Sequence, residues 1–320
     1  MNHLDNFGTN LTSGTSASDT TSPVNSVPSI AAPFWVAFDA TNINSHYETK
    51  LITSKTATNI LHSALAYDHT TAEEIRIVNP AAEFDALSTG WQTGPGTWTY
   101  SSADSPTFVL TTSIDLSSFI GVGARIKLTQ TTAKYFIVTA ISGTTITLYG
   151  GTDYTLTSDA ITLPYFSIMK APIGFPMSPL KWQAQTTDTS NQTQATASAG
   201  TWYNPGSLSL SIPIGAWNVS YQAVAQVYEP SNSAGLNIAL TLSTANNSQS
   251  DADFTVSITR TFGSATMQIM QEYMTATKSL LLAAKTPYYL NVSTSTASTD
   301  QINIKGDNRT TIIRAVCAYL

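Results

Sequence analysis

The side chains that most often carry acid–base or metal chemistry are few and unevenly placed. All four histidines, His3, His46, His62 and His69, precede residue 70, so the last 250 residues contain none. Histidine is the side chain whose charge changes near neutral pH. The distribution therefore excludes histidine-based catalysis from most of the chain.

One set of side chains could be drawn as a zinc site. Its members are His62, Asp68, His69, Glu73 and Glu74. Their spacing matches no established zinc motif, and the single cysteine, Cys317, is far away in the sequence. We therefore expect ordinary surface or core histidines, with no metal and no cofactor.

Paired carboxylates could hydrolyse a glycosidic bond. Asp251 and Asp253 stand two residues apart in a polar loop, a spacing more typical of a solvated turn. The alternating oxygen ligands and glycine of a calcium loop are missing. No phosphate-binding loop, dinucleotide-binding glycine motif or nucleophile elbow is present. We therefore expect a protein without enzymatic activity.

Aromatic residues beside Gly or Pro can instead stack on sugars. Trp202 and Tyr203 are such residues, although core packing is the common alternative, and the loop Ser243–Asp253 is rich in amides and carboxylates. The expected receptor-binding residues are Trp202, Tyr203, Asn246, Asn247, Asp251 and Asp253.

The composition narrows the class of protein. The 320 residues include 14 Lys and Arg, 20 Asp and Glu, and a net charge of −6, with only 11% charged residues. An average domain has roughly 25% charged residues; here Thr and Ser fill the difference, with 87 residues together. The acidic balance argues against nucleic-acid binding. No apolar run approaches the ~18 residues of a membrane helix, so we expect no membrane insertion.

The N-terminal part divides into two expected regions. Residues 1–33 form a low-complexity tail without a signal-peptide pattern, expected to be flexible or to order on a partner, after synthesis in a reducing cytoplasm. Residues 34–90 begin with the apolar cluster Phe34–Phe38. Within them, residues 58–67 carry apolar side chains at helical spacing, which favours one short helix.

The rest of the chain predicts a mainly β protein with little helix. Residues 91–168 contain short β-branched runs separated by glycine turns, with a hairpin expected at Ser142-Gly143, and predict a small antiparallel β-module. Residues 169–181 hold three prolines and are the preferred domain boundary. Residues 182–320 alternate apolar and polar side chains, for example from Trp217 to Val227, and predict a C-terminal β-sandwich or jelly roll.

The last segment, Thr311–Leu320, is largely apolar on both faces. One face should meet the opposite sheet, and the other needs a cover, which a neighbouring subunit or a loop of the same chain could supply. We expect a homotrimer in which this second face lies at the interface. Its residues are Ile312, Arg314, Val316, Ala318 and Leu320.

The C-terminal 140 residues resemble the C1q/TNF-type jelly roll. The likeness lies in the segments Ser207–Tyr221, Leu236–Asn246, Thr277–Val292 and Ile304–Leu320. The chain departs from that family near Ala315, Val316 and Ala318, where the family's Phe-x-Gly-x-Leu-type ending is missing. The resemblance implies a tight trimer with the final strand near the threefold axis.

Residues 98–182 are similar to a β-module of bacteriophage tail, baseplate and other virion proteins. The segments that carry the likeness are 127–132, 135–139, 148–156 and 170–176. The resemblance implies a virion protein, with the N-terminal region contacting other virion proteins and the sandwich binding a host-surface glycan. A purely structural head fibre, decoration, neck or baseplate protein, a glycan depolymerase and a secreted carbohydrate-binding module remain alternatives.

Overall fold

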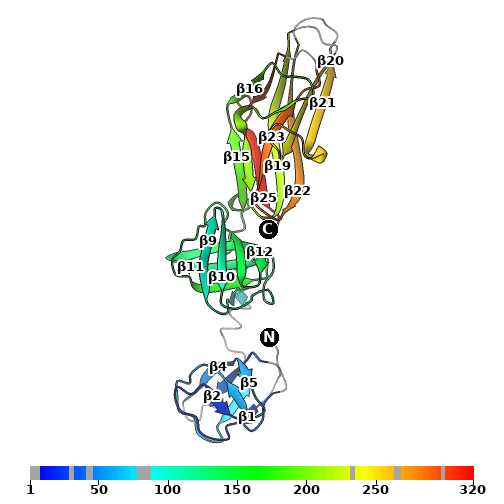
Figure 1. The fold of residues 1–320 in the computed structure, drawn as a ribbon. Coiled ribbons are helices and arrows are strands. Elements are labelled where there is room, and N and C mark those ends of the chain that lie inside the picture. Colours follow the sequence, from blue (N-terminus) through cyan, green and yellow to red (C-terminus); the bar gives the residue numbers. More distant parts are fainter. Residues whose placement is uncertain are drawn as a thin grey trace. The chain divides into compact units, whose positions relative to one another are not determined.

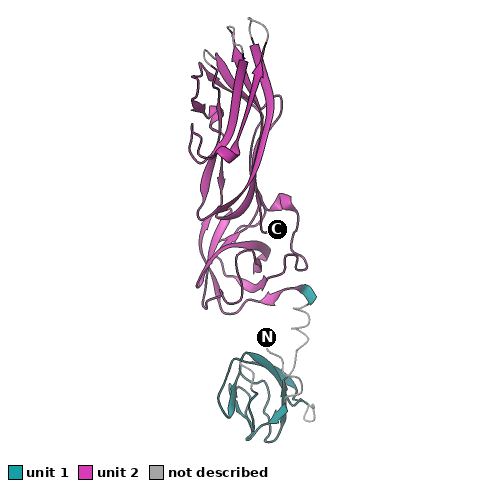
Figure 2. Cartoon of the chain, turned by 90° about the vertical axis from the view of Figure 1, so that its right-hand side faces the viewer, with its two compact units in different colours: residues 1–89 teal, residues 90–320 magenta. Residues whose placement is uncertain are grey.

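The computed structural model describes residues 8–28, 32–40, 46–77, 88–230, 235–262, 268–296 and 300–320. These residues are mainly β, as the sequence predicts, with short 3-10 helices between strands (Figure 1). The chain divides into two compact units, residues 1–89 and residues 90–320 (Figure 2). Each unit is described by itself below.

Unit 1 is built from two small antiparallel sheets. The first has the order β1-β7-β3-β4 and the second the order β2-β6-β5. The strands are β1 (Gly8–Asn10), β2 (Thr21–Pro23), β3 (Phe34–Phe38), β4 (Glu48–Ile52), β5 (Ser54–Lys55), β6 (Asn59–Leu61) and β7 (Glu74–Ile77). The apolar cluster of β3 supplies the centre of the core, in which Phe34 and Phe38 are fully buried.

Two N-terminal expectations differ from this structure. Residues 8–28, expected as a separate tail, pair within unit 1, and their Leu11 and Val24 are buried in its core. The two large apolar side chains, Leu11 and Val24, bury apolar surface in the core of unit 1, and this burial stabilises the pairing of an otherwise Ser/Thr-rich segment. The helix expected over residues 58–67 is wrong, because Ile60 lies in strand β6 and packs into the same core.

The first part of unit 2 is a seven-stranded antiparallel sheet, which we call the β-module. Its order is β8-β14-β11-β12-β13-β10-β9. The strands are β8 (Gln92–Thr93), β9 (Trp98–Asp104), β10 (Thr107–Thr112), β11 (Arg125–Gln130), β12 (Thr132–Ser142), β13 (Thr145–Tyr149) and β14 (Thr162–Ser167). The hairpin predicted at Ser142-Gly143 is confirmed: β12 pairs with β13, and Gly143 has a φ of 56°, which glycine adopts without strain.

The second part of unit 2 is a sandwich of two antiparallel sheets (Figure 1). The six-stranded sheet contains β15 (Gln183–Asp188), β16 (Asn191–Ala195), β19 (Gly215–Glu229), β22 (Gln268–Leu282), β24 (Gln301–Lys305) and β25 (Thr311–Cys317). The five-stranded sheet contains β17 (Trp202–Tyr203), β18 (Ser209–Ile212), β20 (Gly235–Ser243), β21 (Thr255–Thr261) and β23 (Thr286–Ser293). The alternation predicted from Trp217 to Val227 is confirmed, because these inward side chains are buried against β20 and β23.

The β-module and the sandwich share one apolar core at their junction. Tyr149 of the β-module packs edge-on against Trp217 of the sandwich, with ring centroids 4.8 Å apart. Trp182 stacks on Phe175 at 5.0 Å. The proline-rich segment 169–181 therefore does not separate compact units: it is packed between the two parts of unit 2.

Candidate functional site

Asn291 organises a cluster of loops on the outer face of the five-stranded sheet. Its side chain is fully buried and makes three hydrogen bonds with the loop after β20. The amide nitrogen donates to the carbonyl oxygens of Ala245 and Ser248, at 3.0 and 2.7 Å, and the amide oxygen accepts from the Asn247 N–H at 3.2 Å. The loop is thereby fixed with Asn246 and Asn247 exposed.

The same loop reaches the predicted aromatic pair. The backbone N–H of Asn204 donates to the side-chain oxygen of Asn247 at 2.6 Å, directly after Trp202 and Tyr203. These two aromatic residues form β17, which pairs with the end of β23, and both are half-buried. The structure therefore places the loop of Asn246 and Asn247 beside the backbone of Asn204. Tyr203 itself packs against the core of the sandwich, and its hydroxyl oxygen accepts from the Ser198 N–H at 3.0 Å.

Asp251 and Asp253 belong to a different arrangement. Both carboxylates contact the ammonium of Lys278 on β22, at 2.5 and 3.3 Å, and Asp251 also accepts from the Asp253 N–H at the start of a 3-10 helix. The hydrogen bond from Lys278 lowers the pKa of Asp251. A glycosidase acid needs a raised pKa, so Asp251 lacks the electrostatics of an acid catalyst.

Three of the predicted trimer residues, Ile312, Arg314 and Val316, lie on the outer face of β25, whereas Ala318 and Leu320 follow its end and Leu320 packs against the core of unit 2. This strand is flanked by β15 and β19, and its apolar side chains Ile312 and Val316 have Thr, Gln and Asn neighbours on the two adjoining strands. Arg314 donates to Gln185 at 2.8 Å. Ile312, Arg314, Val316 and Leu320 are half-buried and Ala318 is exposed. Among the described residues, no loop of the chain covers this face completely.

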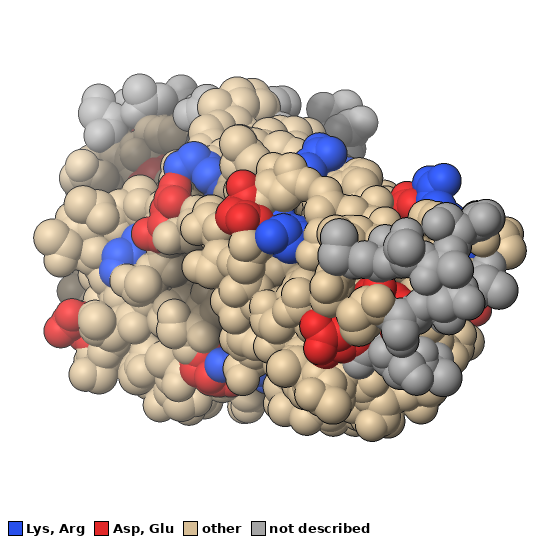
Figure 3. Space-filling model, turned by 90° about the horizontal axis from the view of Figure 1, so that it is seen from above, with Lys and Arg blue, Asp and Glu red and all other residues tan. Residues whose placement is uncertain are grey.

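Charged side chains are sparse on the outside of the molecule. In the view from above, blue and red atoms form small neighbouring groups in a largely uncharged surface (Figure 3). On the six-stranded sheet, side-chain amides hydrogen-bond neighbouring strands to one another. Asn303 donates to Gln226 at 2.9 Å, and Gln226 donates to Gln271 at 3.1 Å. The surface therefore offers hydrogen bonds more than charge.

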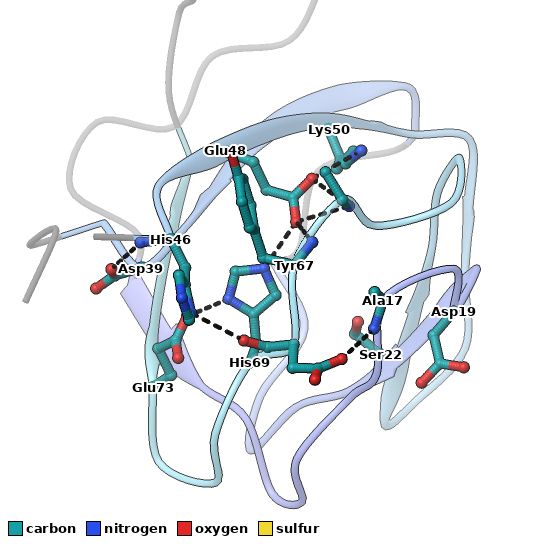
Figure 4. A network of polar contacts seen from close by, with 12 residues as sticks. Ala17, Asp19, Ser22, Asp39, His46, Glu48, Lys50, Tyr67, His69 and Glu73 are labelled. Carbon is teal, nitrogen blue, oxygen red and sulfur yellow. Dashed lines mark hydrogen bonds and ion pairs between the residues drawn. The ribbon is translucent and has the colours of Figure 1, made fainter. Parts of the chain in front are cut away.

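Unit 1 contains a buried polar network around His69 (Figure 4). The ring of His69 lies between two carboxylates: Nδ1 contacts Glu73, and Nε2 contacts Glu48 at 2.8 Å. Burial alone would raise the pKa of Glu48, but hydrogen bonds from Lys50 and His69 outweigh it and lower the pKa to about 2. The spacing of His69 and Glu73 was visible in the sequence, whereas Glu48 comes from β4, 21 residues earlier.

This network is built for stability more than for chemistry. Glu73 and Glu48 occupy the two ring nitrogens of His69, so neither nitrogen is open to a metal ion. The other members of the drawn zinc site lie elsewhere, since His62 bonds Ser22 and Asp68 accepts from Ala17. Across the described parts of the chain, no group of three or more His, Cys, Asp or Glu side chains could hold a metal ion.

The described residues contain no helix with the length and apolar character needed to cross a bilayer. His3 and the expected contacts of residues 1–7 lie outside the described residues. An Asn in an alternating strand carries no signal of the loop it will hold, so the role of Asn291 is visible only in the structure.

No protein-family model matches the chain, and no curated protein matches it. Among solved structures it is similar to the T13 particle of IBDV, with 11% identity, 97% of this chain and 72% of that chain covered, and a TM-score of 0.22. It is also similar to infectious bursal disease virus strain Gx (12% identity, 98% and 78% covered, TM-score 0.21) and to the VP2 subviral particle of that virus (12%, 97% and 75%, 0.21). At TM-scores below 0.5, these likenesses carry no inference about function.

Proposed function

We propose that this chain is a non-enzymatic bacteriophage virion protein, a trimeric fibre or tail-tip component whose sandwich binds a glycan on the host surface. The observation that carries the proposal is the loop cluster held by Asn291. It holds the exposed amides of Asn246 and Asn247 beside the backbone of Asn204, two residues after the half-buried Trp202. Aromatic faces and amides are groups that recognise neutral sugars.

The remaining parts of the chain suit this role. Unit 1 has a core of its own, so it is the part we assign to attachment on the particle. The sparse surface charge limits nonspecific electrostatic adhesion to cells. A trimer would present the same loop cluster three times, and multivalency would convert a weak site into useful attachment.

A glycan array and a panel of bacterial cells test the proposal. We expect the labelled full chain to bind neutral glycans, and the variants Trp202→Ala and Asn247→Ala to weaken binding at least tenfold. Tyr273→Ala is the matched control, because Tyr273 is an exposed aromatic residue on the other sheet, 43% accessible.

Absence of binding to every glycan and every cell at saturating protein would overturn the receptor role and leave the structural head-fibre, decoration or baseplate alternative. Release of reducing ends from a bound glycan would overturn the non-enzymatic reading.

A further inference from the structure

The segment 168–180, which we call the strap, presents an unusual surface. Connecting segments normally carry polar side chains towards water. The strap instead exposes five large apolar side chains. They are Ile168 (73% accessible), Met169 (52%), Ile173 (67%), Met177 (43%) and Leu180 (66%). Single exposed apolar residues are ordinary, but a group of this size marks an interaction surface.

The backbone of the strap is fixed from within. Three of its carbonyl oxygens, spaced three residues apart, accept hydrogen bonds from fully or nearly fully buried side chains. The pairs are Lys170 with Arg125 at 3.1 Å, Ile173 with Trp91 at 2.7 Å and Pro176 with Trp182 at 2.6 Å. Turning the apolar side chains inward would break these bonds and leave buried donors unpaired, which is costly.

The strap is also anchored by one of its own side chains. The buried ring of Phe175 lies between the guanidinium of Arg125, 5.0 Å from its centroid, and the ring of Trp182, stacked at 5.0 Å. Phe175 therefore anchors the strap in the core by its own side chain. The five other large apolar side chains of the strap stay exposed and can contact a partner. A surface ordered before binding loses little entropy on association.

The exposed area suits a stable contact between proteins. The accessible fractions of the five side chains and of neighbouring Leu163 correspond to about 700 Å², close to the ~800 Å² that each partner buries in a standard interface. The strap lacks acidic residues and carries one exposed lysine, Lys170, beside its five apolar side chains, and the adjacent Lys181 is already paired with Asp153. The surface therefore calls for an apolar partner rather than a charged one.

We propose that the strap is the surface through which copies of this chain associate, with the next copy as its occupant. The chain carries further exposed apolar side chains at the same junction: Leu281, 80% accessible, and Phe119 and Val122, 48% each. A chain of contacts places Leu281 near the strap. Leu281 stands opposite Ala216 in the sheet, and the Ala216 N–H donates to the hydroxyl of Tyr319. Arg125 in turn donates to the carbonyl oxygens of Tyr319 and of Lys170 in the strap. A cyclic assembly can place the strap of one copy against this second group on the next, which is a heterologous, closing contact.

This inference rests on the proposed homotrimer for the identity of the partner, but it moves the principal contact away from β25. On the outer face of β25, the apolar side chains Ile312 and Val316 are half-buried and surrounded by polar neighbours, so they offer less apolar area than the strap.

The test is the solution mass of the full chain by light scattering, from about 1 to about 100 μM. We expect the wild type to have about three times the monomer mass. The double variant Ile173→Asp, Leu180→Asp removes two exposed side chains and should raise the dissociation constant at least 100-fold, giving monomers. Ile269→Asp is the matched control, since Ile269 is exposed (49%) at the end of β22 remote from Leu281, and it should stay assembled.

A second pair of substitutions, Ile312→Asp with Val316→Asp, separates the strap from β25. Retained assembly in this variant, with loss in the strap variant, supports the inference. An assembled strap variant overturns it while leaving the trimer intact. A monomeric wild type overturns self-association itself. The receptor role is tested separately, by the glycan-binding experiment. Unchanged circular dichroism of each variant confirms that only association is being measured.

Discussion

The Nη2 atom of Arg125 donates a 2.8 Å hydrogen bond to the carbonyl oxygen of Tyr319, which follows 194 residues later in the sequence. The other donors of this guanidinium bond the carbonyl oxygens of Gly123 and Lys170, at 2.6 and 3.1 Å. Arg125 is fully buried, and burial lowers its pKa. One buried cation, bonded to main-chain carbonyls, thus joins the β-module, the strap and the end of the sandwich.

Replacing Arg125 with Ala should destabilise unit 2 by about 2–4 kcal/mol, because three carbonyls lose their donor and a cavity remains. Arg125→Lys should recover little, since an ammonium cannot reach three separated carbonyls as a planar fork does. Guanidinium unfolding followed by tryptophan fluorescence measures the change. Arg314→Ala, which removes a half-buried arginine with one side-chain bond, is the control and should cost less than about 0.5 kcal/mol. Equal stability of the Arg125 and Arg314 variants would contradict the role assigned to the junction.

The thiol of Cys317 should be unreactive in the folded chain. Burial raises its pKa from the ordinary 9.0 to about 11, so at pH 8 the thiolate is about 100-fold scarcer than in the unfolded chain. Because it is the single cysteine, the rate of iodoacetamide labelling by mass spectrometry reports on this site alone. The same labelling should accelerate in Arg125→Ala as the junction loosens. A native rate equal to the rate in denaturant would show that the site is open.

Substitution of Asn291 with Ala should release the loop after β20. Three hydrogen bonds of a fully buried amide are lost, which predicts a destabilisation of about 2–3 kcal/mol and new proteolytic cleavage within residues 244–250. Limited proteolysis with mass mapping detects the cleavage. Asn218→Ala is the control, because that exposed amide bonds only Ser279. In Asn291→Ala, glycan binding should weaken because the loop is no longer ordered. A loop that still resists proteolysis in this variant would mean that other contacts hold it.

Acid should weaken unit 1 through Glu48. Its pKa is about 2 in the folded chain and 4.5 ordinarily, so its stabilisation is present above pH 4.5 and is lost as the pH falls towards 2. The expected loss is about 1–3 kcal/mol. Hydrogen exchange of peptides covering residues 46–77 follows it in the full chain. Glu48→Gln should remove most of this pH dependence, whereas Glu74→Gln, which breaks an exposed pair with Arg76, should leave it in place.

The sequence was most informative where side chains alternate along a strand. From Trp217 to Val227 the period of two reveals both the strand and its buried face, since sheet geometry alone imposes that period. Ile60 misled the helix expectation because a few apolar residues at helical spacing also suit a short strand turning into a core. In residues 8–28, the two core residues Leu11 and Val24 are surrounded by many Ser and Thr, so the segment has the composition of a tail although it packs into unit 1.

The sequence predicts which individual residues could form a site, but not which residues far apart in the chain come into contact. Trp202 and Asn247 stand out as loop residues in the sequence, but the hydrogen bonds that fix the loop of Asn247 come from Asn291, 44 residues beyond Asn247. Glu48 and His69 likewise meet only through tertiary folding. The strap was recognised as proline-rich, yet its exposed apolar side chains look like core residues until the buried partners of its carbonyls are known.

The pairing of β19 with β22 has a mechanical consequence. The two strands run antiparallel in unbroken register for fifteen residue pairs, from Gly215 opposite Leu282 to Glu229 opposite Gln268. A force along the strands would shear all of these pairs at once, whereas a force across them would open the pairs one after another. Tension applied along these strands therefore meets the sandwich in its strongest direction.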